Sequence, residues 1–140
     1  MLTDNVALAL GLSRAEALLR KRLEGPLGGG HGIGYTDFII LAELSSVVGG
    51  RLRPVDLAAR LLLTPSGVTR AVLPLEKIGL VQRVSHERDS RASYVTLTDT
   101  GRTRVEEAME TVERVVGEAL ASLTRTDRLT LVGLIERLGD

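Results

Sequence analysis

The sequence predicts a mainly α-helical fold (α+β) in which several helices surround one small β-hairpin. Apolar residues recur at steps of three and four along most of the 140-residue chain, which is the period of amphipathic helices. Residues 80–85 and 92–98 instead alternate between apolar and polar side chains, as two paired strands do. The length is close to that of one compact domain, so we expect a single folding unit.

The first helix is expected over residues 6–23. Its apolar side follows the helical period through Leu8, Leu12, Ala15, Leu19 and Leu23. Six of the ten residues from Gly25 to Gly34 are glycine, so we predict that the helix stops at Gly25-Pro26 and that a flexible connector follows. Thr36 is then expected to cap a largely buried helix, in a region that ends at Gly49-Gly50.

Two shorter helices are expected in the middle of the chain. The first covers residues 55–62. The second has the clearest start in the sequence, because Thr64 suits an N-cap and Pro65 suits the first helical position. It should end near Gly79, a residue typical of helix C-termini, and Pro74 should kink it or loosen one turn.

The predicted hairpin has a charged tip, residues 86–91, with Val95 and Leu97 on one face of its second strand. After the hairpin, an apolar stripe at helical spacing runs from Val105 to Leu123. A chain of this size offers that stripe little to bury against, so we favour packing between molecules over packing within one. Thr126 or Asp127 is expected to cap a final helix.

Composition excludes several classes of protein. The absence of cysteine rules out disulfides, cysteine–zinc sites and iron–sulfur clusters, and two histidines are too few for a histidine metal site, so we expect no cofactor. His31, in the glycine-rich segment, is expected to be solvated. The longest charge-free stretch falls far short of the ~20 apolar residues of a membrane span, which together with the lack of a basic leader predicts a soluble cytoplasmic domain. We expect no enzyme, because the serines lack a nearby general base and no phosphate-binding glycine motif follows a strand.

The charge is balanced overall but uneven along the chain. Eight bases and four acids give residues 51–91 a net charge of +4, whereas the flanking segments are slightly acidic. This distribution fits a nucleic-acid contact surface or a chance cluster of solvated charges. For Arg51 and Arg53, contact with phosphate and simple solvation remain equally open.

The order of elements indicates a winged helix-turn-helix. A short helix, a tight turn, a second helix with a polar first turn and then a hairpin follow one another. Such a second helix presents its N-terminal residues to the major groove, which is ~12 Å wide and admits one helix. Ser66, Thr69 and Arg70 lie on those turns, and the Arg70 guanidinium suits a guanine edge. Arg88 and Arg91 on the hairpin are placed to enter an adjacent minor groove.

Two motifs in this region resemble a known family. Residues 63–70 and 75–81 read Leu-Thr-Pro-Ser-Gly-Val-Thr-Arg and Leu-Glu-Lys-Ile-Gly-Leu-Val, and they are similar to the recognition helix of the MarR (multiple antibiotic resistance regulator) family. The hairpin pattern Asp89-x-Arg91-Ala92-x-x-Val95-x-Leu97-Thr98-x-x-Gly101 resembles the wing of that family. The resemblance implies a homodimeric transcriptional regulator, by default a repressor, that binds pseudo-palindromic double-stranded DNA and often responds to a small phenolic or lipophilic ligand.

The resemblance also implies residue roles. Ser66, Thr69 and Arg70 would contact the major groove, and Arg91 would enter the minor groove while Asp89 holds it through an ion pair. The predicted DNA-binding residues are Thr64, Ser66, Thr69, Arg70, Arg88, Asp89 and Arg91.

The same resemblance divides the chain into dimerisation helices, residues 1–34 and 102–140, and a DNA-binding lobe, residues 35–101. Pro74 and the glycine-rich connector depart from the family pattern, which limits what can be transferred at those two places. The alternative is a winged helix that docks on protein and no longer binds DNA. The dependence of binding on salt concentration separates the two.

Overall fold

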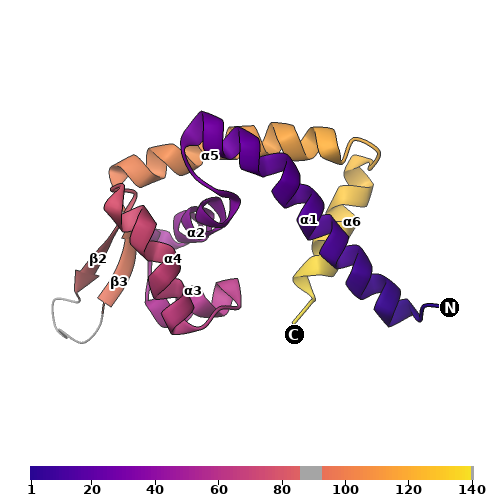
Figure 1. Ribbon diagram of the computed structural model, residues 1–140, viewed down its shortest axis with the longest axis horizontal. Helices are drawn as coiled ribbons and strands as arrows, with labels where there is room; N and C mark the ends of the chain where they lie inside the picture. The colour runs from indigo at the N-terminus through magenta and orange to yellow at the C-terminus, as the bar shows by residue number, and fades with distance from the viewer. Residues whose placement is uncertain (86–92, 140) are drawn as a thin grey trace.

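The computed structural model describes residues 1–85 and 93–139. Figure 1 shows a winged lobe joined to a leg that carries both chain ends, through the long helices that precede and follow the lobe in the chain. The elements in chain order are α1 (Asp4–His31), α2 (Tyr35–Ser46), a 3₁₀ turn (Val48–Gly50), β1 (Arg51–Leu52), α3 (Pro54–Leu61), α4 (Pro65–Lys77), β2 (Val81–Ser85), β3 (Ser93–Leu97), α5 (Asp99–Ala119) and α6 (Arg125–Glu136). The mainly α-helical winged helix-turn-helix fold is therefore confirmed.

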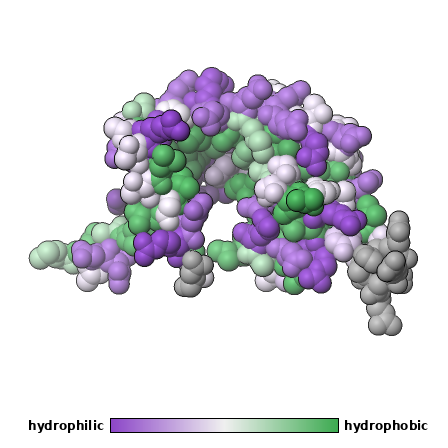
Figure 2. All heavy atoms as spheres, turned by 180° about the vertical axis from the view of Figure 1, so that it is seen from behind, coloured by the Kyte–Doolittle hydropathy of each residue, from purple (hydrophilic) through white to green (hydrophobic). Residues whose placement is uncertain are grey.

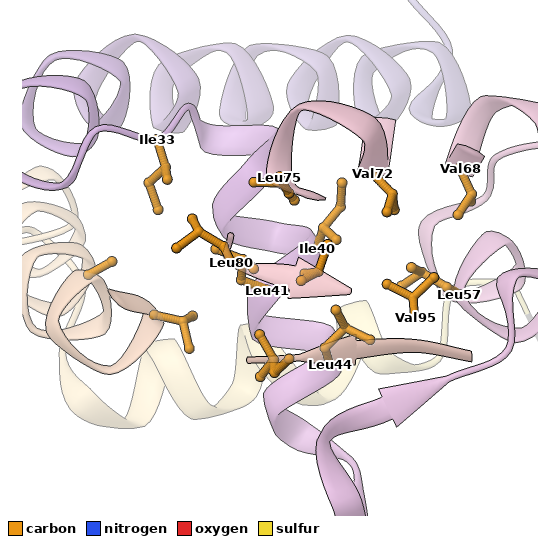
Figure 3. Packing of buried hydrophobic residues seen from close by; sticks show 14 of the residues in the cluster. Ile33, Ile40, Leu41, Leu44, Leu57, Val68, Val72, Leu75, Leu80 and Val95 are labelled. Atoms are coloured by element: carbon orange, nitrogen blue, oxygen red, sulfur yellow. The ribbon is translucent and has the colours of Figure 1, made fainter. Parts of the chain in front are cut away.

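The core forms around α2. Its residues Ile40, Leu41 and Leu44 are fully buried, and the helix packs against α1, α3, α4, α5 and β3. Figure 3 shows these three side chains among Leu57 of α3 and Leu75 of α4. A helix with partners on most sides holds α3 and α4 in place relative to the long helix α5.

The expected break at Gly25-Pro26 is wrong. α1 continues without interruption through the glycine-rich segment and ends at Gly32, whose φ of 67° lies in the left-handed region that glycine favours. Leu23 and Leu27 lie one turn apart on its buried side. Burying two leucines outweighs the helix-weakening effect of Gly25 and of the glycines that follow Leu27, so tertiary packing decides the structure of this segment.

The expectation that His31 is solvated is wrong for the same reason. His31 occupies the last turn of α1 and is partly buried against α5. Its Nε2 lies 2.7 Å from Thr111 Oγ1, and Arg104 Nη1 donates a hydrogen bond of 2.9 Å to the His31 carbonyl. These two contacts fasten the C-terminal end of α1 to the middle of α5.

Two helices begin earlier than the sequence analysis places them. α2 starts after Gly34, not after Thr36, and Asp37 Oδ2 accepts a hydrogen bond of 2.8 Å from the Gly34 N–H. α6 starts after Thr124, not after residue 126 or 127, with reciprocal bonds between Thr124 and Asp127. In both helices an aspartate serves as the third helical residue and bonds back to the cap. The bonds to Thr124 lower the pKa of Asp127.

A three-stranded antiparallel sheet forms beside this core, with strand order β1-β3-β2. The β2–β3 pair spans the register from Val81 opposite Leu97 to Ser85 opposite Ser93. Val95 and Leu97 are buried, so the predicted facing of the second strand is confirmed. β1 was not expected, because two residues are too few to show a strand period.

The long helix α5 packs within its own chain along much of its length. Val105 and Ala108 are fully buried, and Val115 of the second half is buried as well, while α5 contacts both α1 and α2. The expectation that the stripe has little to bury against within one chain is therefore wrong for these positions. The helix also ends at Ala119, so Leu123 lies in the turn beyond it. In contrast, α6 buries none of its residues in this chain.

The end of α4 meets the start of α5 at a close backbone crossing. The Thr98 N–H donates to the Leu80 carbonyl at 3.1 Å. The Thr98 hydroxyl donates to the Gly79 carbonyl at 2.6 Å and accepts from the Gly101 N–H at 3.0 Å. Gly101 is buried at this crossing, and a Cβ added to it would overlap the Leu80 carbonyl oxygen. Only glycine therefore fits at this position.

Replacing Gly101 with alanine is expected to destabilise the protein by about 2–4 kcal/mol, because the crossing must open to admit the methyl group. Denaturant unfolding measures the change. The matched control is Gly29→Ala in α1, where nothing lies within 4 Å of the added Cβ. That change should stabilise the helix by about 0.5–1 kcal/mol. Equal stability of the two variants would contradict the crossing as described.

Candidate nucleic-acid interface

α3 and α4 form a helix-turn-helix joined by residues 62–64. α3 ends at Leu61, one residue earlier than expected, and Leu62 adopts a left-handed conformation that turns the chain. α4 buries one side, Val68, Val72 and Leu75, against the core. Its opposite side is exposed, and this side includes the first turn of the helix.

The N-terminal turn of α4 is built as the sequence predicts. Thr64 is the N-cap, and its Oγ1 accepts a hydrogen bond of 3.1 Å from the Gly67 N–H. Ser66 Oγ is exposed and lies 3.2 Å from the Thr64 hydroxyl. A Cβ on Gly67 would lie 3.2 Å from Thr64 Oγ1, so glycine leaves room for this cap. The result is an ordered polar surface at the positive end of the helix dipole.

The next predicted contact residues lie one turn further along. Thr69 is half-buried, and its hydroxyl donates to the Pro65 carbonyl at 3.2 Å. Arg70 is exposed and forms no ion pair with any residue that the structure describes. α4 continues through Pro74 to Lys77, and Gly79 then adopts a φ of 78°, as its predicted role at the helix end requires.

Most other cations of the winged lobe have partners. Arg53 pairs with Asp56 at 2.9 Å, and this hydrogen bond raises the pKa of the guanidinium. Arg60 pairs with Glu43 at 3.0 Å.

Two further cations in this lobe are engaged. Arg83 pairs with Glu76 at 3.6 Å, and the Arg51 guanidinium stacks 4.6 Å above the Tyr94 ring. No local sequence signal predicts the Arg51–Tyr94 contact, because the contact depends on the unexpected strand β1. Such exposed pairs are weak, so these side chains can still turn toward a phosphate. Among the described cations of this lobe, Arg70 and Lys77 have no such partner to leave, and of these two Arg70 is the one in the first turns of α4.

The geometry places α4 and the hairpin strands on a common side. In Figure 1 the N-terminal end of α4 and the Ser85 and Ser93 ends of β2 and β3 point to the lower edge of the winged lobe. Arg88, Asp89 and Arg91 lie outside the described residues, so their predicted roles stay predictions.

Comparison with known proteins identifies the family. The model of the MarR family matches residues 31–92. A solved MarR-family regulator from Streptomyces coelicolor, Sco3205 in complex with DNA, is 27% identical with a TM-score of 0.82, and the match covers 97% of this chain and 86% of that one. This chain belongs to the MarR family. It is therefore a helix-turn-helix transcriptional regulator of the MarR family.

Two further likenesses to transcriptional regulators extend over nearly the whole chain. The transcriptional regulator BldR from Sulfolobus solfataricus is 32% identical with a TM-score of 0.78 and is matched over 99% of this chain and 98% of its own. YwaE, an HTH-type transcriptional regulator of Bacillus subtilis, is 25% identical over 98% of this chain and 79% of its own length. YdgJ of the same organism is 34% identical, but the match spans about half of it, 51%.

Among the described residues, no helix of this MarR-family chain is both long and apolar enough to cross a lipid bilayer.

Proposed function

We propose that this MarR-family chain binds a pseudo-palindromic duplex operator as a homodimer and represses transcription. The observation that carries the proposal is the first turns of α4. They are exposed, capped and polar, and they present Arg70 without an ion-pair partner among the described residues. A helix end of this kind fits the major groove, where a free guanidinium can bind O6 and N7 of a guanine. The DNA complex of the similar Sco3205 also supports it.

The proposal assigns the remaining groove contacts by position. Ser66 and Thr64 offer hydroxyls at the end of α4, where backbone phosphates approach a helix N-terminus. Thr69 already bonds to the backbone of its own helix, so its methyl group is the part left for a base. Arg88 and Arg91 would enter the minor groove, with Asp89 holding Arg91 in orientation.

Homodimer formation is proposed from the leg of the molecule. α6 leaves one side apolar and exposed. Leu131, Leu134 and Ile135 of this helix, with Leu138 just beyond its end, line a groove with Leu8 and Leu12 of α1. Figure 2 shows hydrophobic side chains along this leg on the left. A continuous apolar surface of this kind in a soluble regulator marks a contact with another protein surface. A second copy of the chain supplies the same surface by two-fold symmetry.

The division into dimerisation helices, residues 1–34 and 102–140, and a DNA-binding lobe, residues 35–101, remains part of this proposal. The two parts share one core, because Leu27 of α1 and Val105 of α5 pack in the same cluster as Ile40. A movement of the dimer leg is therefore transmitted to α2 and to the helices that α2 supports. The proposal also includes release of DNA by a small lipophilic or phenolic ligand, and this part is supported by the family resemblance alone.

Replacing Arg70 with alanine is expected to weaken binding to a tightly bound duplex, selected from a random-sequence pool, by about 1–3 kcal/mol. Preference at one base position of each half-site should relax as well. Fluorescence anisotropy at several salt concentrations measures both the affinity and its salt dependence. The control is Lys77→Ala, which removes another exposed cation, at the far end of α4, and should have a smaller effect that is uniform across sequences.

Two results would contradict DNA recognition through α4. One is full affinity of Arg70→Ala. The other is a wild-type salt slope near zero, since each neutralised phosphate adds about 0.9 to the log–log slope. A slope near zero would instead favour docking on protein.

Replacing Leu134 with glutamate is expected to dissociate the dimer. Leu134 is exposed in the single chain but would be buried between the two chains of the dimer, so the variant would place a charged carboxylate in that interface. Light scattering at micromolar concentration should give the mass of two chains for the wild type and of one chain for the variant. Val48→Glu is the control, since Val48 is fully exposed on the winged lobe. A wild-type mass of one chain would rule out the homodimer.

A further inference from the structure

Leu62, in the turn between α3 and α4, combines two unfavourable properties. Its φ of 54° makes it the sole non-glycine residue with a positive φ among residues 1–85 and 93–139. Its side chain is 92% exposed, so it gains almost nothing from burial in its own chain. A left-handed conformation costs free energy for a residue with a Cβ, and here nothing within the chain offsets that cost.

The ends of α1 and α4 show that glycine ordinarily occupies this left-handed position in the protein. At the end of α3, the N–H groups of Leu62 and Leu63 donate to the carbonyls of Ala59 at 3.4 Å and Ala58 at 2.9 Å. At the end of α4, Gly79 and Leu80 make the same pair of bonds to Glu76 at 3.1 Å and Leu75 at 2.9 Å. The two helices thus end in the same motif, with glycine at the left-handed position of one and leucine in the other. α1 likewise ends at a left-handed glycine, Gly32.

The exposed leucine adjoins the surface that reads DNA in the proposed function. Leu62 lies two residues before Thr64, the cap of α4, so their Cα atoms are at most about 7 Å apart. Residues 62–66 are all exposed and form one continuous stretch of surface with the first turn of α4. A helix inserted by this end therefore brings the Leu62 side chain toward the rim of the same groove.

We propose that Leu62 is an apolar DNA-contact residue. It packs against the hydrophobic groups that a duplex offers beside the major groove, which are the thymine C5-methyl group and the face of the deoxyribose. Burial of its side chain on binding offsets the cost of its backbone conformation. The inference rests on the proposed function, because it requires α4 to enter the groove.

Three variants at this position separate contact from backbone strain. Leu62→Gly removes the side chain and the strain, Leu62→Ala removes most of the side chain and keeps the strain, and Leu62→Met keeps an apolar side chain of similar size. The first two should lose affinity for the selected duplex by about fivefold, as expected for losing about 40 Å² of buried apolar surface. Leu62→Met should bind nearly as the wild type does.

Thermal unfolding without DNA provides a readout that a purely structural role would not give. Leu62→Gly should unfold at or above the wild-type temperature while binding DNA more weakly, because glycine adopts the left-handed conformation freely. A residue that merely supports the turn would lose stability and affinity together. If Leu62→Gly has an unchanged or higher unfolding temperature but a lower affinity for DNA, the result supports a direct contact between Leu62 and DNA.

The source of the apolar contact follows from base substitution. Deoxyuridine lacks the thymine methyl group, so replacing thymines of the selected duplex one at a time should weaken the wild type at one position per half-site and leave Leu62→Ala unaffected. If no deoxyuridine substitution weakens binding by the wild type, but Leu62→Gly and Leu62→Ala still bind the selected duplex more weakly, the contact is with the deoxyribose face.

Wild-type affinity of Leu62→Gly and Leu62→Ala, measured alongside a weakened Arg70→Ala, would overturn this inference and leave the proposed function standing. If Arg70→Ala also binds fully and the wild type shows no salt dependence, the proposed function itself fails. The two failures are therefore distinguishable in one set of titrations.

Discussion

The structure depends on the backbone crossing between the end of α4 and the start of α5. One threonine hydroxyl, that of Thr98, caps α5 and also bonds to the Gly79 carbonyl, while Gly101 allows the Leu80 carbonyl to lie directly against the helix. The two wing strands meet the crossing at one end each, because β2 begins at Val81, directly after Leu80, and β3 ends at Leu97, directly before Thr98. The recognition helix, the wing and the long helix therefore share one fixed reference point.

The sequence predicted the parts of the fold that local signals decide. Thr64 and Pro65 mark the start of α4 because capping and proline geometry depend on neighbouring residues alone, and Gly79 marks its end for a similar reason. The course of α1 could not be predicted in this way. Its glycine-rich segment is helical because Leu27 is buried in the core and His31 bonds to α5, and both contacts join residues far apart in the chain.

The candidate site divides along the same line. The exposure of Arg70 and the hydroxyl of Ser66 follow from helical spacing, so they could be named from the sequence. The partners of Arg53 and Arg60, and the stacking of Arg51, arise from tertiary structure. Four of the six bases that the structure describes in residues 51–91 are thus engaged in weak surface contacts. In the proposed function, specific recognition depends on a small number of side chains around the first turns of α4.

A dimer built through the leg presents two recognition helices related by two-fold symmetry, which is the central claim about how this regulator reads DNA. Hydroxyl-radical footprinting on the duplex recovered by selection tests it most directly. We expect two protected half-sites in inverted repeat, with centres about 10 bp apart, because consecutive major grooves on one face of the duplex are one helical turn apart. Protection of a single asymmetric half-site by the wild-type protein would contradict the account.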